Sequence, residues 1–325
     1  MHVSTTLGYT WRRYGGYSSV AERRSVAADV VGSKPTSRPN HPPLPVPQPR
    51  KQATAEAASR QQPTRVFAGT SGWAYPTWKP GFYPAGVSAK KFLPFYAANL
   101  NSVEVNYTFA KLPTPAKVEE WIAQVPEGFR FSLKAPQRIT HFRRLRECES
   151  HLAEFFQLLT PFAQAGRMGM VLFQLPANFK ADPDRLAAFL QQPSLRLPST
   201  PPIAFEFRHE TWFTPQTYAV LEDFGAALCI ADTDNLKTPE IHTAPRHTCF
   251  RLRRNGGYKP REIVAFAARF AALGREREVY AYFRHQEEPT GALNAAALHR
   301  ALSRPDQALS RPDQALSRPS RKDAQ

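Results

Sequence analysis

Ile203-Ala-Phe-Glu-Phe-Arg-His-Glu-Thr-Trp212 begins as an apolar, aromatic strand and then collects charged and titratable residues. Glu206 and Arg208 stand two residues apart, so on a strand their side chains point to the same face. Two ionised side chains on so apolar a strand are costly unless they pair or hold a ligand. This stretch therefore predicts a strand that ends in a functional site, with the rest of the chain as its scaffold.

Seven more strand-like runs lie on either side of this stretch, and helical patterns separate most of them. Strands that alternate with helices predict βαβ units and a parallel sheet, and eight units within residues 66–300 match a TIM-type (β/α)8 barrel of about 250 residues. We expect a loop at the sixth crossover, residues 233–247, because no helical pattern occurs there. The predicted strands are 66–72, 102–109, 129–134, 168–175, 202–208, 226–232, 249–253 and 278–284, and the predicted helices are 91–99, 115–125, 147–165 with an interruption near Pro161, 182–191, 214–225, 261–273 and 293–302.

The two ends of the chain depart from this pattern. Residues 41–49 have a polyproline II composition, and residues 16–39 resemble the translation of a transfer-RNA gene. The C-terminal segment repeats Ala-Leu-Ser-Arg-Pro, and the recurring proline forbids a continuous helix. We predict a disordered or spurious extension over residues 1–65, a barrel domain over residues 66–300 and a disordered low-complexity tail over residues 301–325.

The charge of the chain is concentrated at these ends. Residues 1–65 carry ten Lys and Arg against three Asp and Glu, and residues 301–325 carry five against three, so the ends supply more than half of the net charge of +16. The barrel segment is only moderately basic, which suits a small anionic partner as well as it suits nucleic acid.

Cysteine usage and hydropathy indicate the compartment. Cys148, Cys229 and Cys249 show no CxxC spacing, which is typical of reduced, buried thiols. No apolar run approaches the ~18 residues of a membrane span, and the N-terminus lacks a signal-peptide pattern. We expect a cytoplasmic protein with no membrane partner; the sequence does not indicate its oligomeric state.

Polar residues follow nearly every predicted strand. Parallel barrels place their active sites at the C-terminal ends of the strands, so these side chains are expected to meet at one rim. A shared rim of costly polar groups points to a ligand site. The candidate catalytic residues are Glu206, His209, Lys134 and Asp232, and the candidate substrate-binding residues are Thr70, Trp73, Glu104, Asn106, His141, Gln174, Arg208, Trp212, Arg251 and Arg253.

Each candidate also has a structural interpretation. Glu206 would serve as a buried partner of Arg208 or Lys134, and His141 and His209 would serve as helix caps. The aromatic residues are more often loop packing than stacking platforms, and arginines near residue 251 more often form a solvated edge. Both interpretations remain open at the level of the sequence.

Two chemistries suit the set. In the first, Glu206 or His209 is a general acid or base, while Lys134 and the arginines neutralise an anionic substrate. In the second, Glu104, Glu206, Asp232 and a histidine hold a divalent metal that activates water. We rank the metal lower because no HxH or HExxH motif occurs, and we expect no dinucleotide because no GxGxxG follows a strand.

The motifs in the barrel segment resemble the YecE-like family, called domain of unknown function 72, in the order of that family over residues 66–300. The resemblance implies a TIM-type barrel with a pocket and brings no reaction with it. The chain departs from the family pattern at Arg253-Arg254-Asn255-Gly256 and at Arg284-His285-Gln286-Glu287. The matching motifs are Thr70-Ser-Gly-Trp73, Trp78 with Phe82-Tyr-Pro84, Val103-Glu-Val-Asn106, Trp121, Phe131-Ser-Leu-Lys134, Ile139-Thr-His141, Val171-Leu-Phe-Gln-Leu-Pro176 and Phe205-Glu-Phe-Arg-His209 with Trp212.

Three functions remain open at this stage. The first is an enzyme, of hydrolase or isomerase type, that acts through an acid/base rim site on a small anionic or sugar-like substrate. The second is a nucleic-acid-binding or processing protein, whose rim arginines and aromatic residues engage phosphates and bases. The third is a barrel that binds a ligand without catalysis.

Overall fold

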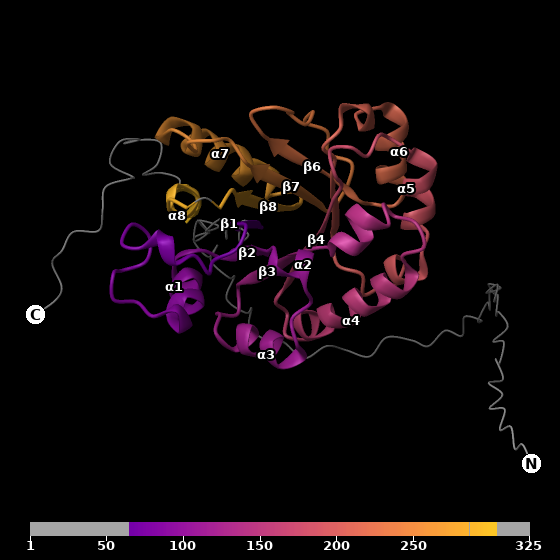
Figure 1. Ribbon diagram of the computed structural model, residues 1–325. Coiled ribbons are helices and arrows are strands. Elements are labelled where there is room, and N and C mark those ends of the chain that lie inside the picture. Colours follow the sequence, from indigo (N-terminus) through magenta and orange to yellow (C-terminus); the bar gives the residue numbers. More distant parts are fainter. Residues whose placement is uncertain (1–64, 286, 304–325) are drawn as a thin grey trace, which may run out of the picture. The chain divides into compact units, whose positions relative to one another are not determined.

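The computed structural model describes residues 65–285 and 287–303, and our predictions for residues 1–64 and 304–325 lie outside these ranges. In the described part, eight parallel strands form one sheet in the order β1-β8-β7-β6-β5-β4-β3-β2 (Figure 1). The TIM-type barrel predicted from the sequence is confirmed. The strands are β1 Val66–Thr70, β2 Ser102–Val105, β3 Arg130–Lys134, β4 Met168–Gln174, β5 Ile203–Glu206, β6 Ala227–Asp232, β7 His247–Leu252 and β8 Glu278–Phe283.

Helices follow the strands and cover the outside of the sheet (Figure 1). Several begin with a side-chain cap: Thr114, Asp182 and Thr214 each accept a hydrogen bond from a backbone N–H in the first turn. The helices are α1 Phe92–Asn99, α2 Tyr107–Ala110, α3 Pro115–Ala123, α4 Glu149–Gln164, α5 Pro183–Leu190, α6 Pro215–Asp223, α7 Pro260–Leu273 and α8 Thr290–Ser303, with a π-helical turn, η3, at Arg138–Phe142.

Two element predictions were wrong. The strand predicted over residues 102–109 ends at Val105, because the backbone of Asn106 turns to the right-handed helical region and α2 begins. Helix α4 continues through Pro161 without interruption. The carbonyl that loses its partner there belongs to Gln157, which is exposed, so water can take that hydrogen bond.

The crossover from β6 to β7 contains no helix, as the sequence predicted. Thr243 fixes this long loop, because its hydroxyl accepts from the backbone N–H of Leu228 at 2.8 Å and donates to the carbonyl of Ala226 at 2.7 Å. These bonds hold the end of the loop beside the N-terminal end of β6, while its start follows the C-terminal end of β6, where Asp234 and Asn235 line a cavity.

The seam between β1 and β2 is closed mainly by side chains. One isolated bridge joins Ser71 to Glu104. The amide of Asn101 bonds both the N–H of Ala68 and the carbonyl of Val66, each at 2.8 Å. The hydroxyl of Tyr96 accepts from the N–H of Thr70 at 2.8 Å and donates to the carbonyl of Ser102 at 3.0 Å. These two side chains take the place of a backbone ladder.

Gly69 allows this close approach, since a Cβ there would lie 1.9 Å from the carbonyl oxygen of Ser102. We expect Gly69→Ala to lower the free energy of unfolding by about 2–3 kcal/mol, because the seam must open to admit the methyl group. Urea unfolding measures this change. Gly128→Ala is the control, because no atom of the described residues lies within 4 Å of its Cβ position. Equal stabilities of the two variants would contradict the seam described here.

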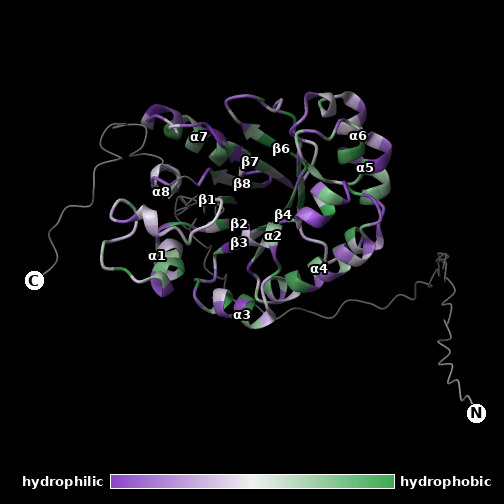
Figure 2. Ribbon diagram, viewed as in Figure 1, coloured by the Kyte–Doolittle hydropathy of each residue, from purple (hydrophilic) through white to green (hydrophobic). Residues whose placement is uncertain are grey.

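Apolar side chains fill two layers. The larger one lies between the strands and the helices, and Figure 2 shows green along the strands and purple on parts of the surrounding helices. The smaller one fills the barrel interior towards the N-terminal ends of the strands and includes Phe67, Met170, Leu172, Tyr280 and Tyr282. Above it, at the C-terminal ends of the strands, the interior becomes polar, which positions the candidate site.

Candidate functional site

Arg251 is the centre of the polar interior. It is fully buried, and its guanidinium group reaches across the barrel from β7 to carboxylates on two strands that are not its neighbours. Its Nε and Nη2 donate to the carboxylate of Glu104 on β2 at 2.9 and 2.7 Å, and its Nη1 donates to Glu206 on β5. Charges this deeply buried are stable only when they are paired and fully hydrogen-bonded.

The two glutamates are held as carboxylates. Burial alone would raise the pKa values of Glu104 and Glu206, but the positive charge of Arg251 outweighs it, and both pKa values lie below the ordinary value. Gln174 donates to Glu206 at 2.9 Å, and Nε of Arg208 donates to its other oxygen at 3.1 Å. A glutamate whose two oxygens are engaged in this way is a counter-ion and a poor proton-transfer group.

Lys134 lies at the end of β3 beside this cluster. Among the described residues its amine makes no hydrogen bond and no ion pair, and it lies over the ring of Phe109, 3.6 Å from the centroid. Burial, and then repulsion from Arg251, lower the pKa of Lys134 from 10.5 to about 7. The amine is therefore part neutral and part charged near pH 7, unlike an ordinary lysine.

Lys134 lines a cavity of about 450 Å³ together with His141, Asn106, Gln174 and Arg208. His141 comes from the π-helical turn, and its Nδ1 lies 2.9 Å from the hydroxyl of Thr140. Burial, and then the charge of Lys134, lower the pKa of His141 to about 4, so the ring is neutral at pH 7. The side-chain oxygen of Asn106 is buried and has no hydrogen-bond donor among the residues that the structure describes.

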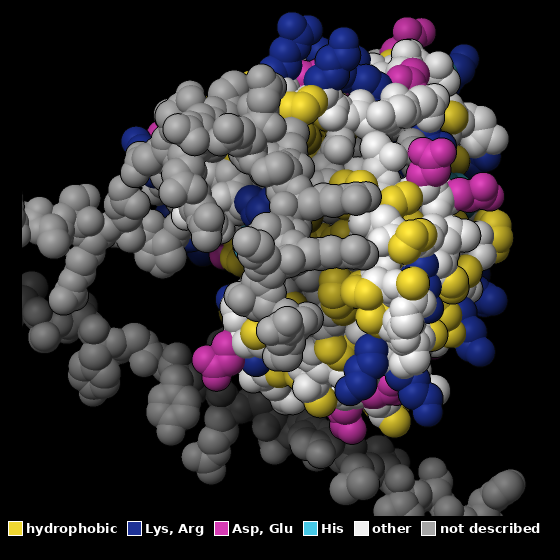
Figure 3. All heavy atoms as spheres, turned by 90° about the vertical axis from the view of Figure 1, so that its left-hand side faces the viewer, with side chains coloured by type: hydrophobic (Ala, Val, Ile, Leu, Met, Phe, Trp, Pro, Cys, Tyr) yellow, Lys and Arg dark blue, Asp and Glu magenta, His cyan; other side chains and the backbone are white. Residues whose placement is uncertain are grey.

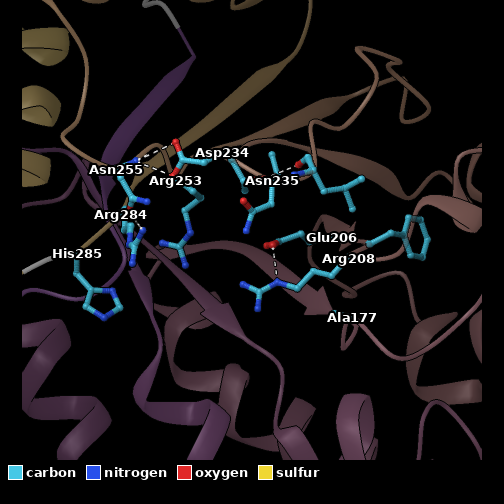
Figure 4. A pocket seen from close by; sticks show the side chains of 13 residues that line it. Ala177, Glu206, Arg208, Asp234, Asn235, Arg253, Asn255, Arg284 and His285 are labelled. Atoms are coloured by element: carbon cyan, nitrogen blue, oxygen red, sulfur yellow. Dashed lines mark hydrogen bonds and ion pairs between the residues drawn. The ribbon is translucent and has the colours of Figure 1, made fainter.

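A second cavity, of about 640 Å³, adjoins the first, because Arg208, Arg253 and His285 line both. Figure 4 shows Glu206 and Arg208 on one side of it, and Arg253, Arg284 and His285 on the other. The loops after β6 and β7 supply the remaining polar lining residues, namely Thr233, Asp234, Asn235 and Asn255.

Arg253 differs from the other arginines of the site. It donates to the hydroxyl of Ser71 at 2.8 Å, and in the described part of the chain it forms no ion pair with a carboxylate. Burial, and then the neighbouring charge of Arg251, lower the pKa of Arg253 to about 10. A half-buried guanidinium group without a carboxylate partner, at the wall shared by two cavities, is suited to hold an anion.

The structure brings together most of the predicted site residues. Seven of them line one or both cavities, and the buried pair of Glu104 and Arg251 lies in the same ionic cluster through Glu206 and Ser71. The seven are Glu206, Lys134, Asn106, His141, Gln174, Arg208 and Arg253.

The other five predicted residues line neither cavity and have packing, capping or hydrogen-bonding roles in the fold. Thr70 is buried against Tyr96, and Trp73 packs edge-on against Trp121. His209 caps a short 3₁₀ turn by accepting from the N–H of Thr211. The indole N–H of Trp212 donates to the carbonyl of Phe179 at 2.7 Å. The carboxylate of Asp232 accepts from the guanidinium group of Arg254 at 2.8 Å.

Several site residues were absent from the predicted set. Ser71 links Glu104 to Arg253, and Tyr75 stacks on His285 with ring centroids 5.1 Å apart. Phe109 contacts Lys134 from the short helix α2, which was mistaken for a strand. The cluster of Asp and Asn at residues 232–235 after a predicted strand was a usable signal for the loop that lines the larger cavity.

The carboxylates proposed as ligands of a divalent metal form ion pairs with arginines instead. Glu104 and Glu206 face the guanidinium group of Arg251, and Asp232 faces Arg254. In residues 65–285 and 287–303, no group of three or more His, Cys, Asp and Glu side chains is arranged to hold a metal ion. Cys148, Cys229 and Cys249 are buried free thiols.

Comparison with known sequences places the chain in a family. Residues 67–319 match the family described as protein of unknown function DUF72. The chain belongs to the DUF72 family. This confirms the resemblance drawn from the motifs at the strand ends.

Individual relatives match parts of the chain. It is 26% identical over 191 residues to UPF0759 protein YunF of Bacillus subtilis (strain 168), a match that covers 56% of this chain and 66% of YunF. It is 35% identical over 114 residues to UPF0759 protein YecE of Escherichia coli (strain K12), covering 35% of this chain and 39% of YecE. These matches therefore span less than two thirds of either relative.

The DUF72 fold is also found in solved structures. The crystal structure of a DUF72 family protein from Thermotoga maritima MSB8 is 25% identical, with a TM-score of 0.63, and the match covers 73% of this chain and 99% of that one. Among the residues described for this DUF72 protein, no helix has the length and apolar character needed to cross a membrane.

Proposed function

We propose that the mouth of the barrel is an active site that binds a small anionic substrate, such as an organic acid or a phosphorylated sugar. Arg253 and Arg208 hold its anionic group, and the amine of Lys134 acts on its reacting part. The observation that carries this proposal is Lys134, a partly neutral amine that lines a cavity and has no hydrogen-bond acceptor among the described residues.

Charge supports the sign of the ligand. Around the two cavities and in the cluster beneath them, four guanidinium groups meet three carboxylates: those of Arg208, Arg251, Arg253 and Arg284 against those of Glu104, Glu206 and Asp234. One positive charge remains before Lys134 is counted, and it lies in a partly buried setting where water screens it weakly. An anion that enters the cavity would complete the neutralisation.

The reacting group is reassigned relative to the sequence analysis. A general acid or base works best when its pKa lies near the operating pH, which favours Lys134 over Glu206. Glu206 is better suited to orient Arg208 and Arg251. His209 and Asp232, which serve a turn and an ion pair, have no part in the proposed chemistry.

Cavity size favours a small molecule over a polymer. Volumes of about 640 and 450 Å³ are in the range of small-ligand pockets. In the coloured part of the face in Figure 3, Lys and Arg side chains lie in separate groups with Asp and Glu among them. This part of the surface lacks the continuous basic stripe that suits nucleic acid, which remains the alternative partner.

Thermal unfolding at constant ionic strength tests the proposal, with lactate, inorganic phosphate and 3-phosphoglycerate as probes. We expect at least one anion to stabilise the protein, by about 2.7 kcal/mol at a hundred times its Kd. Arg253→Gln should weaken that anion at least about tenfold, the loss expected for one charge-assisted contact. This substitution leaves no carboxylate without its partner among the described residues, so the fold should persist.

Arg254→Gln is the matched control, because Arg254 serves the ion pairs with Asp232 and Glu262 and lines neither of the two cavities. Equal anion stabilisation in Arg253→Gln and the native protein would contradict the proposed site. Tight binding of a single-stranded oligonucleotide, with a steep dependence on salt and no response to small anions, would favour nucleic acid instead.

A further inference from the structure

In its neutral form, the amine of Lys134 has a lone pair that can bond to a substrate. In the described part of the chain no hydrogen-bond acceptor takes its protons, and the amine lies over the ring of Phe109. A lysine that is buried beside other cations is the type that attacks carbonyl carbon in enzymes. The cations here are Arg251, buried below it, and Arg208 and Arg253, which line the same cavity.

His141 offers a proton acceptor in the same cavity. The hydroxyl of Thr140 lies 2.9 Å from Nδ1 of His141 and 3.3 Å from the carbonyl of Pro136, and it can accept from Nδ1 or donate to it, according to the tautomer of the ring. In the tautomer with the ring proton on Nδ1, Nε2 has a free lone pair. His141 is thus a neutral base in a cavity that it shares with the lysine.

Asn106 adds a side-chain oxygen that accepts no hydrogen bond from the described residues. Its side-chain oxygen is buried without a donor among the described residues, although the residue lines the cavity. Buried acceptors in folded proteins almost always have a donor, so this oxygen points to a hydroxyl or amine hydrogen supplied by a ligand. The hydroxyl of an addition product between an amine and a carbonyl group is such a donor.

We propose that Lys134 forms a Schiff base with a small carbonyl compound that carries an anionic group, such as a 2-oxo acid. This inference rests on the function proposed above, because it uses the same cavity, and it names the substrate class. Arg253 and Arg208 hold the anionic group in the cavity that Lys134 lines, so the carbonyl carbon is presented to the amine.

The reaction is balanced as follows. Nζ of neutral Lys134 forms a bond to the carbonyl carbon, and a proton passes from the nitrogen to the carbonyl oxygen, with His141 as the carrier. The C–O bond of this carbinolamine then breaks, and the oxygen leaves as water after taking one further proton from solvent. The product is an iminium ion, so one water is released and one proton is consumed for each bond between nitrogen and carbon.

Reduction with cyanoborohydride tests this step. The full-length protein is incubated with pyruvate and the reductant, and intact mass and peptide mapping follow the product. We expect one reduced pyruvyl adduct per chain, located on Lys134, that forms at least about tenfold faster than on any exposed lysine because its amine is partly neutral at pH 7. Dihydroxyacetone phosphate serves as the second probe, in which the anion is a phosphate.

Two variants and two further probes separate the possible results. Lys134→Arg keeps a cation but has no nucleophilic amine, and should form no adduct. Lys111→Met removes an exposed lysine next to α2 and should react as the native protein does. Acetone, which has the carbonyl group without the anion, should react slowly, while lactate, which has the anion without the carbonyl group, should slow the reaction of pyruvate by competition.

Adducts spread over exposed lysines, or an unchanged rate in Lys134→Arg, would overturn the Schiff base. If lactate or phosphate still stabilised the protein through Arg253 in that case, the anion site would stand and the carbonyl chemistry alone would fall. If neither anions nor carbonyl compounds had any effect, both proposals would fall.

Discussion

Arg251→Met is expected to lower the free energy of unfolding by about 3–5 kcal/mol at pH 7, because it leaves buried carboxylates without their cation. Glu104 is most affected, since it is fully buried and accepts two hydrogen bonds from Arg251. Urea unfolding at pH 7 measures the loss. Arg254→Met is the control, and a surface ion-pair arginine of this kind contributes at most about 1 kcal/mol.

The same variant should reverse the pH dependence of stability. In the native protein the pKa values of Glu104 and Glu206 are lowered, so their contribution is complete above the ordinary pKa of about 4.3 and is lost as pH falls further. Without Arg251, burial dominates and raises the pKa of Glu104. Stability of the variant should then rise as pH falls from 7 to 5, and a fall over that interval would contradict the role of Arg251.

Lys134→Met is expected to make the protein more stable and the site inactive. Below pH 7 both the folded and the unfolded chain carry the lysine proton, and the folded state bears the full cost of a buried charge beside Arg251. Removing that cost should raise the free energy of unfolding by about 2–4 kcal/mol at pH 6. The reaction that depends on the amine should be lost entirely.

The sign of the effect with pH follows from the lowered pKa. Between about pH 7 and 10 the unfolded chain binds the Lys134 proton more tightly than the folded one, so native stability gains from rising pH. The advantage of Lys134→Met should therefore shrink towards pH 10. Lys111→Met, at an exposed lysine, should change stability little at either pH, and a destabilised Lys134→Met protein would argue that Lys134 is a structural residue.

The sequence was sufficient for the barrel and for the convergence of charges, because both follow from patterns that one chain displays. Apolar runs separated by capped helices specify the parallel sheet, and ionic groups at the ends of such runs are too costly to lie apart. Glu206 and Arg208 illustrate this: they were expected on one face, and Nε of Arg208 lies 3.1 Å from Glu206 although β5 ends at residue 206.

The sequence predicted less well which residues of each strand point into the barrel. In β6, Cys229 and Ala231 pair in register with Cys249 and Arg251, which places Asp232 on the helix side with Arg254. Both faces of β6 are apolar, so alternation gives no sign of which residues point inward. Likewise, where the backbone turns away directly after a strand, as before His209 and Trp212, spacing along the chain no longer fixes direction.

The closure of β1 against β2 has a consequence for solubility. Strands that lack a backbone partner offer their N–H and carbonyl groups to other chains, which is a common route to aggregation. Asn101 and Tyr96 occupy the groups of Val66, Ala68 and Thr70 that would otherwise be offered. In closing the barrel, these two side chains also shield β1 from intermolecular strand pairing.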